Sequence, residues 1–146
     1  MKKTIFGVML VASIGSVYAA DVSFSAGVNR GADENIGVVG IGTTMHQFRL
    51  DAKVGHTADT ATSVGFGVGR SVKLWSLSIT PQIGAAYVES DSRALKSGGI
   101  VTTGVNFAYP VIKNMAVTVD VSRQWDIQSR TNFEGTVITA GLRTSF

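Results

Sequence analysis

Apolar and polar residues alternate along most of the chain, starting just after residue 20. In the segment 22–30, apolar side chains occupy every second position, and small or polar residues stand between them (Val22, Phe24, Ala26 and Val28 form the apolar set). Successive side chains of a β-strand point to opposite faces, so this period of two predicts a strand with one apolar face. The same pattern recurs and predicts seven more strands, at 37–45, 48–56, 63–70, 75–87, 100–109, 117–122 and 137–146.

Segments rich in turn-forming residues separate these strands. Connections rich in turn residues are predicted at 31–35, 57–59, 90–99 and 126–134, and brief connections at 45–47, 71–73 and 110–114. Connections this short fit tight hairpins between antiparallel strands that run up and down in sequence order. No linker or second domain is evident, so residues 20–146 are predicted to form one all-β domain.

The two faces of the predicted strands differ in size more than in polarity. Opposite the apolar face stand small residues, among them ten glycines (Gly27, Gly40, Gly42, Gly55, Gly65, Gly67, Gly69, Gly84, Gly104 and Gly141). A soluble barrel would turn its apolar face inward and show charge to water, but only 16% of this chain is charged and 45% is hydrophobic. Small residues suit the narrow interior of an eight-stranded barrel, which leaves the bulky face in contact with lipid. We therefore predict an eight-stranded antiparallel up-and-down transmembrane β-barrel.

The first nineteen residues have the pattern of a secretory signal peptide. Lys2 and Lys3 precede an uncharged apolar stretch at 5–15, and Val17 and Ala19 supply small residues before a cut at Ala20. The predicted organisation is a cleaved signal peptide at 1–19 and a barrel domain at 20–146. Removal of the signal peptide leaves positive and negative charges nearly balanced, so no nucleic-acid partner is expected. The chain has no cysteine, so no disulfide framework holds it together.

Aromatic residues gather near the two ends of the predicted strands. One group lies near one end (Phe48, Trp75, Tyr109 and Phe146), and Tyr87 and Trp125 lie near the other. Aromatic girdles of this kind mark the two membrane–water interfaces. The alternative is that these are ordinary core aromatics.

Taken together, the signal peptide, the eight amphipathic strands and the closing segment 135–146, which ends in Phe146, resemble the small eight-stranded outer-membrane β-barrel proteins of the OmpA/OmpX type. The resemblance implies a monomer in the outer membrane of a Gram-negative bacterium. It also implies recognition of the last strand and Phe146 by the barrel-assembly machinery. The predicted loops are shorter than those of adhesive members, and Thr144 and Ser145 stand where an aromatic-rich ending is common.

A few charged residues fall on the predicted inner face. They are Arg49, Asp51, Lys53, Asp120 and Arg143. Asp120 is expected between Arg143 on the neighbouring strand and Lys53 or Arg49 across the lumen, because an unpaired charge in a narrow lumen would cost several kcal/mol. This set favours a charge network that plugs the barrel. The alternative is a gate in a very narrow, faintly cationic diffusion pore.

Two arginines, Arg30 and Arg123, are predicted to face lipid near the rim that carries the longer loops. A guanidinium group binds phosphate through two parallel hydrogen bonds, so contact with lipopolysaccharide phosphate is a hypothesis for this pair. The alternative is that both side chains extend to water. The loops carry more acids than bases but lack the ligand spacing of a defined metal site, so neither a metal nor a cofactor is expected.

These observations predict a structural or lipopolysaccharide-contacting membrane protein, with a small porin-like pore and then a surface adhesin as alternatives. An enzyme is not expected. The chain has two histidines: His46 falls in a short turn, and His56 faces lipid at a loop edge without a serine placed beside it by a motif.

Overall fold

The computed structural model describes residues 20–30, 34–57, 61–90, 97–127 and 133–146. The predicted signal peptide and parts of the predicted loops (31–33, 58–60, 91–96 and 128–132) lie outside the described residues. Within the described part the chain forms nine strands: β1 (Ala20–Asn29), β2 (Glu34–Met45), β3 (Phe48–Thr57), β4 (Ala61–Arg70), β5 (Val72–Leu74), β6 (Leu77–Ser90), β7 (Gly98–Ile112), β8 (Met115–Asp126) and β9 (Gly135–Ser145). No helix among these residues is long and apolar enough to cross a membrane.

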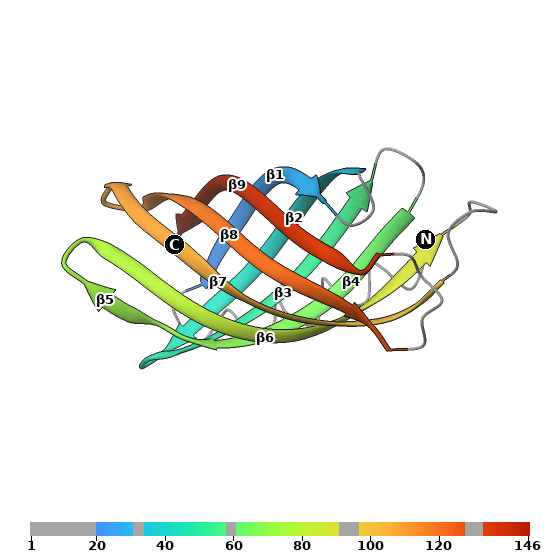
Figure 1. Ribbon diagram of the computed structural model, residues 1–146. Coiled ribbons are helices and arrows are strands. Elements are labelled where there is room, and N and C mark those ends of the chain that lie inside the picture. The colour runs from blue at the N-terminus through green and yellow to red at the C-terminus, as the bar shows by residue number, and fades with distance from the viewer. Residues whose placement is uncertain (1–19, 31–33, 58–60, 91–96, 128–132) are drawn as a thin grey trace.

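The sheet closes on itself (Figure 1). Apart from β4 and β5, each strand pairs antiparallel with its sequence neighbours; β1 also pairs with β9, and β4 pairs with β6. The short strand β5 continues β4 along the same edge of β6 after a break at Ser71. The predicted all-β, eight-stranded antiparallel up-and-down barrel is therefore confirmed, with β4 and β5 sharing one position in the ring.

The barrel is strongly staggered. The register leads from Ala20 on β1 through Thr43, Leu50, Val68, Ile83, Thr103, Arg123 and Thr136. It then returns to β1 at Arg30, whose N–H donates to the Thr136 carbonyl over 2.9 Å. Such an offset tilts the strands against the barrel axis. A path that follows the pairing once around the ring therefore starts at Ala20, at one end of β1, and returns at Arg30, just beyond the other end.

The two ends of the barrel differ in their connections. Two-residue turns join β2 to β3 (46–47), β5 to β6 (75–76) and β7 to β8 (113–114), and both chain ends of the barrel lie at this same end, which we name the turn end. The opposite end, the loop end, carries the longer connections. His46 and Trp75 each open a turn with a positive φ, 58° and 53°, a conformation that usually selects glycine.

Two predicted connections are wrong in position. The turn predicted at 71–73 lies at Trp75 and Ser76 instead, because Val72 and Leu74 continue the alternation and pair with Ile79 and Leu77 on β6. The connection predicted at 110–114 shrinks to two residues, since β7 extends past an irregularity in its pairing with β8 near Pro110. Both hairpins are consequently longer than predicted.

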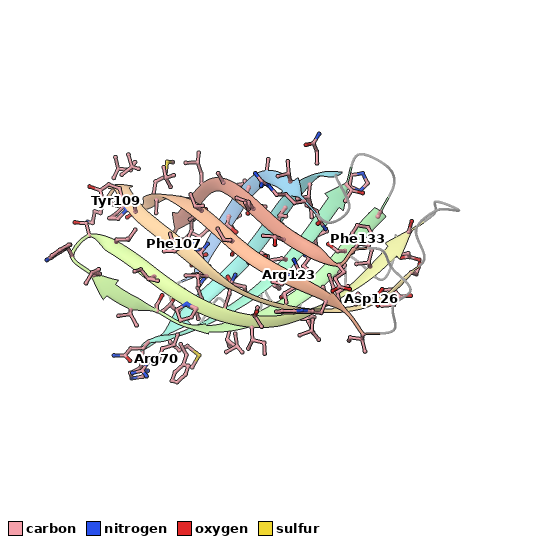
Figure 2. All side chains as sticks on the ribbon, viewed as in Figure 1. Arg70, Phe107, Tyr109, Arg123, Asp126 and Phe133 are labelled. Carbon is pink, nitrogen blue, oxygen red and sulfur yellow. The ribbon has the colours of Figure 1, made fainter. Side chains whose placement is uncertain are left out.

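The apolar face points outward. Phe24, Phe66 and Leu142 stand on three different strands and remain 57%, 56% and 49% exposed, and side chains project from the outside of the ribbon all around the barrel (Figure 2). The interior is filled by small and polar residues. Gly42, for example, faces the lumen where any Cβ would collide with Arg49 and Asp51, so a larger residue there would exclude the charged groups.

Candidate functional site

A buried ion-pair cluster lies inside the turn end of the barrel. Arg49 on β3 donates from Nη1 to Asp21 Oδ2 and from Nη2 to Asp21 Oδ1, both over 2.7 Å. Its Nη2 also lies 2.8 Å from Asp51 Oδ1. The Arg49 side chain is only 3% exposed. This two-pronged pairing is the geometry in which arginine and carboxylate bind most strongly, and it joins β1 to β3 across the strand between them.

Arg143 on β9 completes this cluster from the other side of β1. Its Nε lies 3.7 Å from Asp21 Oδ1, and its Nη2 donates to Asn106 Oδ1 on β7 over 2.8 Å. Asp21 thus accepts from Arg49 and lies close to Arg143. We name Asp21, Arg49, Asp51 and Arg143 the turn-end ion cluster.

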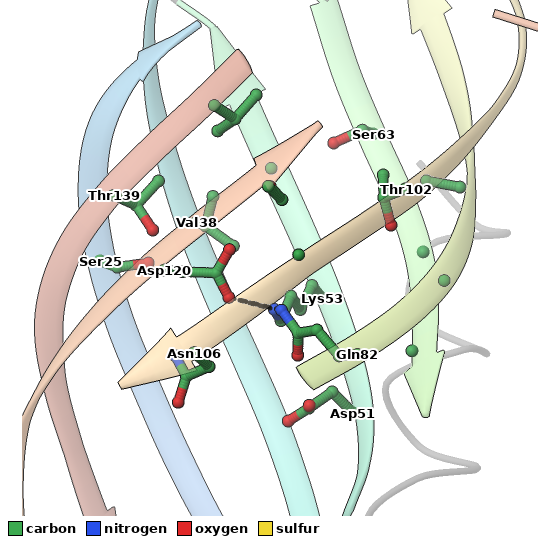
Figure 3. Close-up of a pocket in the computed structure, with 18 of the residues that line it drawn as sticks. Ser25, Val38, Asp51, Lys53, Ser63, Gln82, Thr102, Asn106, Asp120 and Thr139 are labelled. Carbon is green, nitrogen blue, oxygen red and sulfur yellow. Dashed lines mark hydrogen bonds and ion pairs between the residues drawn. The ribbon is translucent and has the colours of Figure 1, made fainter. Parts of the chain in front are cut away.

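A second polar group lies nearer the middle of the lumen (Figure 3). Asp120 on β8 accepts from Gln82 Nε2 over 2.5 Å, and its Oδ2 lies 3.4 Å from Lys53 Nζ. Of the two partners expected across the lumen, Lys53 or Arg49, the structure brings Lys53 to Asp120. Arg143, expected at the side of Asp120, instead lies against Asp21 and donates to Asn106.

Asp21 is the functional-site residue that the sequence reasoning missed. It stands on the same alternate face as Ser23 and Ser25, which was the signal that could have placed it inside, but the predicted strand began one residue later. With Asp21 included, the close charged contacts of the lumen join three acids (Asp21, Asp51 and Asp120) to three bases (Arg49, Lys53 and Arg143). The charges of these six side chains cancel, so this network lacks the positive excess expected of a faintly cationic pore.

A cavity of about 120 Å³ lies inside the barrel beyond the turn-end ion cluster. Hydroxyl and amide side chains line much of it, including Ser25, Ser63, Thr102, Thr139 and Gln82. A polar cavity of this size has room for several water molecules. We name it the central chamber.

At the loop end an apolar cluster lies in the lumen beside buried Asn29 and Thr57. Ala61, Val88, Ile100 and Phe133 form a buried cluster, each at most 4% exposed, and Ala86 packs against it. Phe133 comes from the segment before β9 (Figure 2), which the sequence reasoning assigned to a loop without a role. We name these five residues the apolar cap.

On the outer wall, Arg30 and Arg123 flank the same residue of β9. Arg123 pairs in register with Thr136, and its Nη1 donates to the Thr136 hydroxyl over 3.4 Å. Arg30 follows β1 and bonds the Thr136 carbonyl through its backbone N–H. The Arg123 guanidinium also lies 4.0 Å from Glu134, with both side chains more than half exposed. The two arginines are thus separated by one strand, and both lie at the loop end.

The six aromatic residues of the predicted girdles are all exposed. Phe48, Tyr109 and Phe146 lie at the turn end, and Tyr87 and Trp125 lie near the loop end. Trp75 stands at the tip of a hairpin rather than at the start of a strand, and it is 94% exposed. The Phe146 N–H donates to the Ala20 carbonyl over 3.0 Å, which ties the end of the chain to β1.

The two histidines lie at opposite ends of the barrel. His46 is in the β2–β3 turn, whereas His56 is near the loop end of β3, with its Nδ1 3.2 Å from the Thr62 hydroxyl. Across the described part of the chain, no group of three or more histidine, aspartate or glutamate side chains is arranged to hold a metal ion.

Comparison with known proteins concerns the fold. No protein-family model and no curated protein sequence matches the chain. Among solved structures, a de novo designed transmembrane β-barrel, TMB2.3, is similar over 87% of this chain and 93% of its own, with a TM-score of 0.64 and 20% identity. The chain has the fold of a small transmembrane β-barrel. Outer membrane protein Ail of Yersinia pestis is similar over 88% of this chain and 99% of its own (TM-score 0.60, 7% identity). The outer membrane enzyme PagL is similar over 86% and 98% (TM-score 0.54, 13% identity).

Proposed function

We propose that this chain is a monomeric, integral outer-membrane protein of a Gram-negative bacterium, exported with a cleaved signal peptide, with a structural and lipopolysaccharide-contacting role. The observation that carries the proposal is the reversed polarity of the barrel, which is apolar on its outside and polar in its lumen. Large apolar side chains such as Phe24, Phe66 and Ile83 are more than half exposed, whereas the charged side chains of the lumen are paired. Water does not favour such a surface, but the hydrocarbon of a bilayer does.

A simple fractionation experiment tests this location. We expect the mature chain in the membrane fraction, released only by detergent, with a gel mobility that shifts on heating because a closed barrel resists the gel detergent at room temperature. Recovery of the mature chain dissolved in the periplasm would contradict the proposal.

Orientation follows from the connections. In barrels of this kind the short turns face the periplasm and the longer loops face the exterior, so Arg30 and Arg123 lie in the outer leaflet. Lipopolysaccharide occupies that leaflet and carries phosphates. Two arginines separated by one strand, with Thr136 between them, offer several N–H donors to one phosphate-bearing headgroup.

The arginine pair can be tested against a matched control on the same wall. Arg70 also faces outward, but at the turn end, where it donates to the Gln47 side chain over 2.8 and 3.1 Å. We expect the double variant Arg30→Gln and Arg123→Gln to bind lipopolysaccharide about tenfold or more weakly, because each charge-assisted hydrogen bond contributes about 1.5–3 kcal/mol. Arg70→Gln should bind normally. Equal binding by the double variant and the parent, or an equal loss with Arg70→Gln, would refute the lipopolysaccharide site.

For the lumen we propose a closed, plugged barrel, with a small diffusion pore as the alternative. The ion pairs and the apolar cap stand in the path through the barrel, which supports a plug. The pore is favoured by the central chamber and by a wide vestibule of about 840 Å³ at the turn end, lined in part by Ser71, Lys73 and Ser78. Planar-bilayer recordings separate the two: we expect no steady conductance from the parent protein, and a reproducible open level would establish the pore.

We propose no catalytic role and no cofactor. The chain has the fold of the outer membrane enzyme PagL, but His46 lies at the turn end, far from the outer leaflet, and His56 contacts a threonine hydroxyl rather than a serine. Incubation of the purified protein with labelled lipopolysaccharide should release no product, and hydrolysis above that of a His56→Ala variant would reverse this proposal.

A further inference from the structure

The apolar cap differs in chemistry from every other part of the described lumen. Ala61, Val88 and Ile100 are each 2% exposed and Phe133 is 4% exposed, although all four lie at the loop end of the barrel, where the wall meets its surroundings. They come from β4, β6, β7 and the segment before β9, so the cluster bridges strands from different sides of the ring. The four side chains form one buried apolar cluster at this end of the barrel.

Phe133 is the only member of this group that lies outside a strand, and two polar contacts hold its surroundings. Its carbonyl accepts from Asn29 Nδ2 over 3.4 Å, and the same amide donates to Gln124 Oε1 over 3.4 Å. Asn29 is itself only 1% exposed. Nearby, the Ala61 N–H donates to the Thr57 hydroxyl over 3.3 Å. The Phe133 ring is therefore held in the mouth by a side-chain hydrogen bond to its own backbone carbonyl, and not by pairing between strands.

Two barriers of opposite chemistry consequently lie in series along the barrel. At the loop end an apolar constriction resists ions because their hydration shells are not replaced there. At the turn end Arg49 and its carboxylate partners fill the lumen through short hydrogen bonds. The central chamber between them is polar and holds water-sized space.

We infer that Phe133 is the loop-side gate of the central chamber, and that solutes reach this chamber from the loop end only when the ring leaves the mouth. The inference requires the closed barrel but not contact with lipopolysaccharide, so its test in detergent micelles can fail while the proposed membrane role stands. Passage through the whole lumen would require the turn-end ion cluster to open as well.

The chain contains no cysteine, so a single introduced thiol reports access to the chamber. Ser122 on β8 lines it, and Ser122→Cys can be challenged in micelles with a small, charged methanethiosulfonate reagent. We expect slow labelling in the parent background and labelling at least about tenfold faster when Phe133→Ser is added, since burial of the ring favours the closed state by more than one factor of ten. Phe133→Leu, which keeps an apolar plug, should stay close to the parent rate.

Two results would overturn the gate. One is equal labelling with Phe133 and with Phe133→Ser; the other is labelling in the parent background as fast as at exposed Ser97→Cys. Each variant is first checked for the heat-dependent gel shift of a closed barrel, and Phe133→Thr replaces Phe133→Ser if the latter fails that check.

Ion conductance tests the series arrangement independently. Phe133→Ser alone should remain closed to ions, as should Asp21→Ser with Arg49→Ser, whereas the three substitutions together should give a steady conductance. Steady conductance from the Asp21 and Arg49 pair alone would show that Phe133 blocks nothing. A silent triple variant would show that the chamber is no part of a path.

Discussion

Replacing Asp21 with alanine removes the acceptor on which the turn-end ion cluster depends. Arg49 would lose two hydrogen bonds of 2.7 Å, and Arg143 would lose the carboxylate 3.7 Å from its Nε. Removing one partner of a buried ion pair costs about 3–5 kcal/mol, because the other charge stays buried without compensation. Asp51 remains 2.8 Å from Arg49, and the cluster borders the open vestibule, so we expect the lower part of that range, about 3 kcal/mol.

The free energy of unfolding can be measured by urea titration in phospholipid vesicles, followed by tryptophan fluorescence and by gel mobility. Ser23→Ala is the matched control, since Ser23 shares the strand and the face of Asp21 but makes only a 3.4 Å bond to the Gly40 carbonyl. Adding Arg49→Met to Asp21→Ala should cost less than the sum of the two single losses, because the double variant no longer buries the Arg49 guanidinium without the Asp21 carboxylate. A loss from Asp21→Ala no larger than that from Ser23→Ala, or strict additivity of Asp21→Ala and Arg49→Met, would show that Asp21 does not stabilise the buried Arg49.

Three further substitutions probe other parts of the barrel. Gly42→Ala should destabilise by about 1–3 kcal/mol, because its Cβ would collide with the ion cluster, whereas Gly37→Ala, with nothing within 4 Å of its Cβ, should stay close to the parent in the same titration. Asp120→Ala should lower the melting temperature and reduce the free energy of unfolding by about 1–2 kcal/mol, since Asp120 accepts from Gln82 and pairs with a partly exposed Lys53. An unchanged melting temperature would show that this pair does not stabilise the barrel. Phe146→Ala should reduce assembly in cells but leave the stability of the refolded barrel within about 0.5 kcal/mol, because the Phe146 side chain is 79% exposed. A large loss of stability in the refolded Phe146→Ala barrel would show that the Phe146 ring stabilises the fold by packing, rather than serving as a signal for assembly.

The alternation of side chains was enough to predict the barrel and its inside and outside. Residues such as Phe24 and Leu50 repeat at every second position, and a closed sheet needs no further information to place them on one face. The same rule would have placed Asp21 inside. It was missed because the strand was started at Val22, next to the predicted cleavage position, where alternation has too few neighbours to be read.

Other features depend on contacts that no local pattern contains. Phe133 lies outside the strands, and its burial arises from side chains on β4, β6 and β7, which meet only when the sheet closes. The partners of Arg49 and Arg143 depend on the stagger of the register, which brings Asp21 between them. The β5–β6 hairpin is longer than predicted, and its turn lies at Trp75. The positive φ of Trp75 is a backbone conformation that local sequence rules assign to glycine, so the sequence did not indicate a turn there.

The long β5–β6 and β7–β8 hairpins make the apolar wall taller along one side of the molecule. They carry Val72, Leu74, Val111 and Ile112, each more than half exposed, and Figure 1 shows both hairpins reaching farther left than the β2–β3 turn. A bilayer of uniform thickness cannot match a belt of unequal height, and the mismatch is relieved by leaning or by local thinning of the lipid. The barrel should therefore lean in its membrane and distort the inner leaflet unevenly around its circumference.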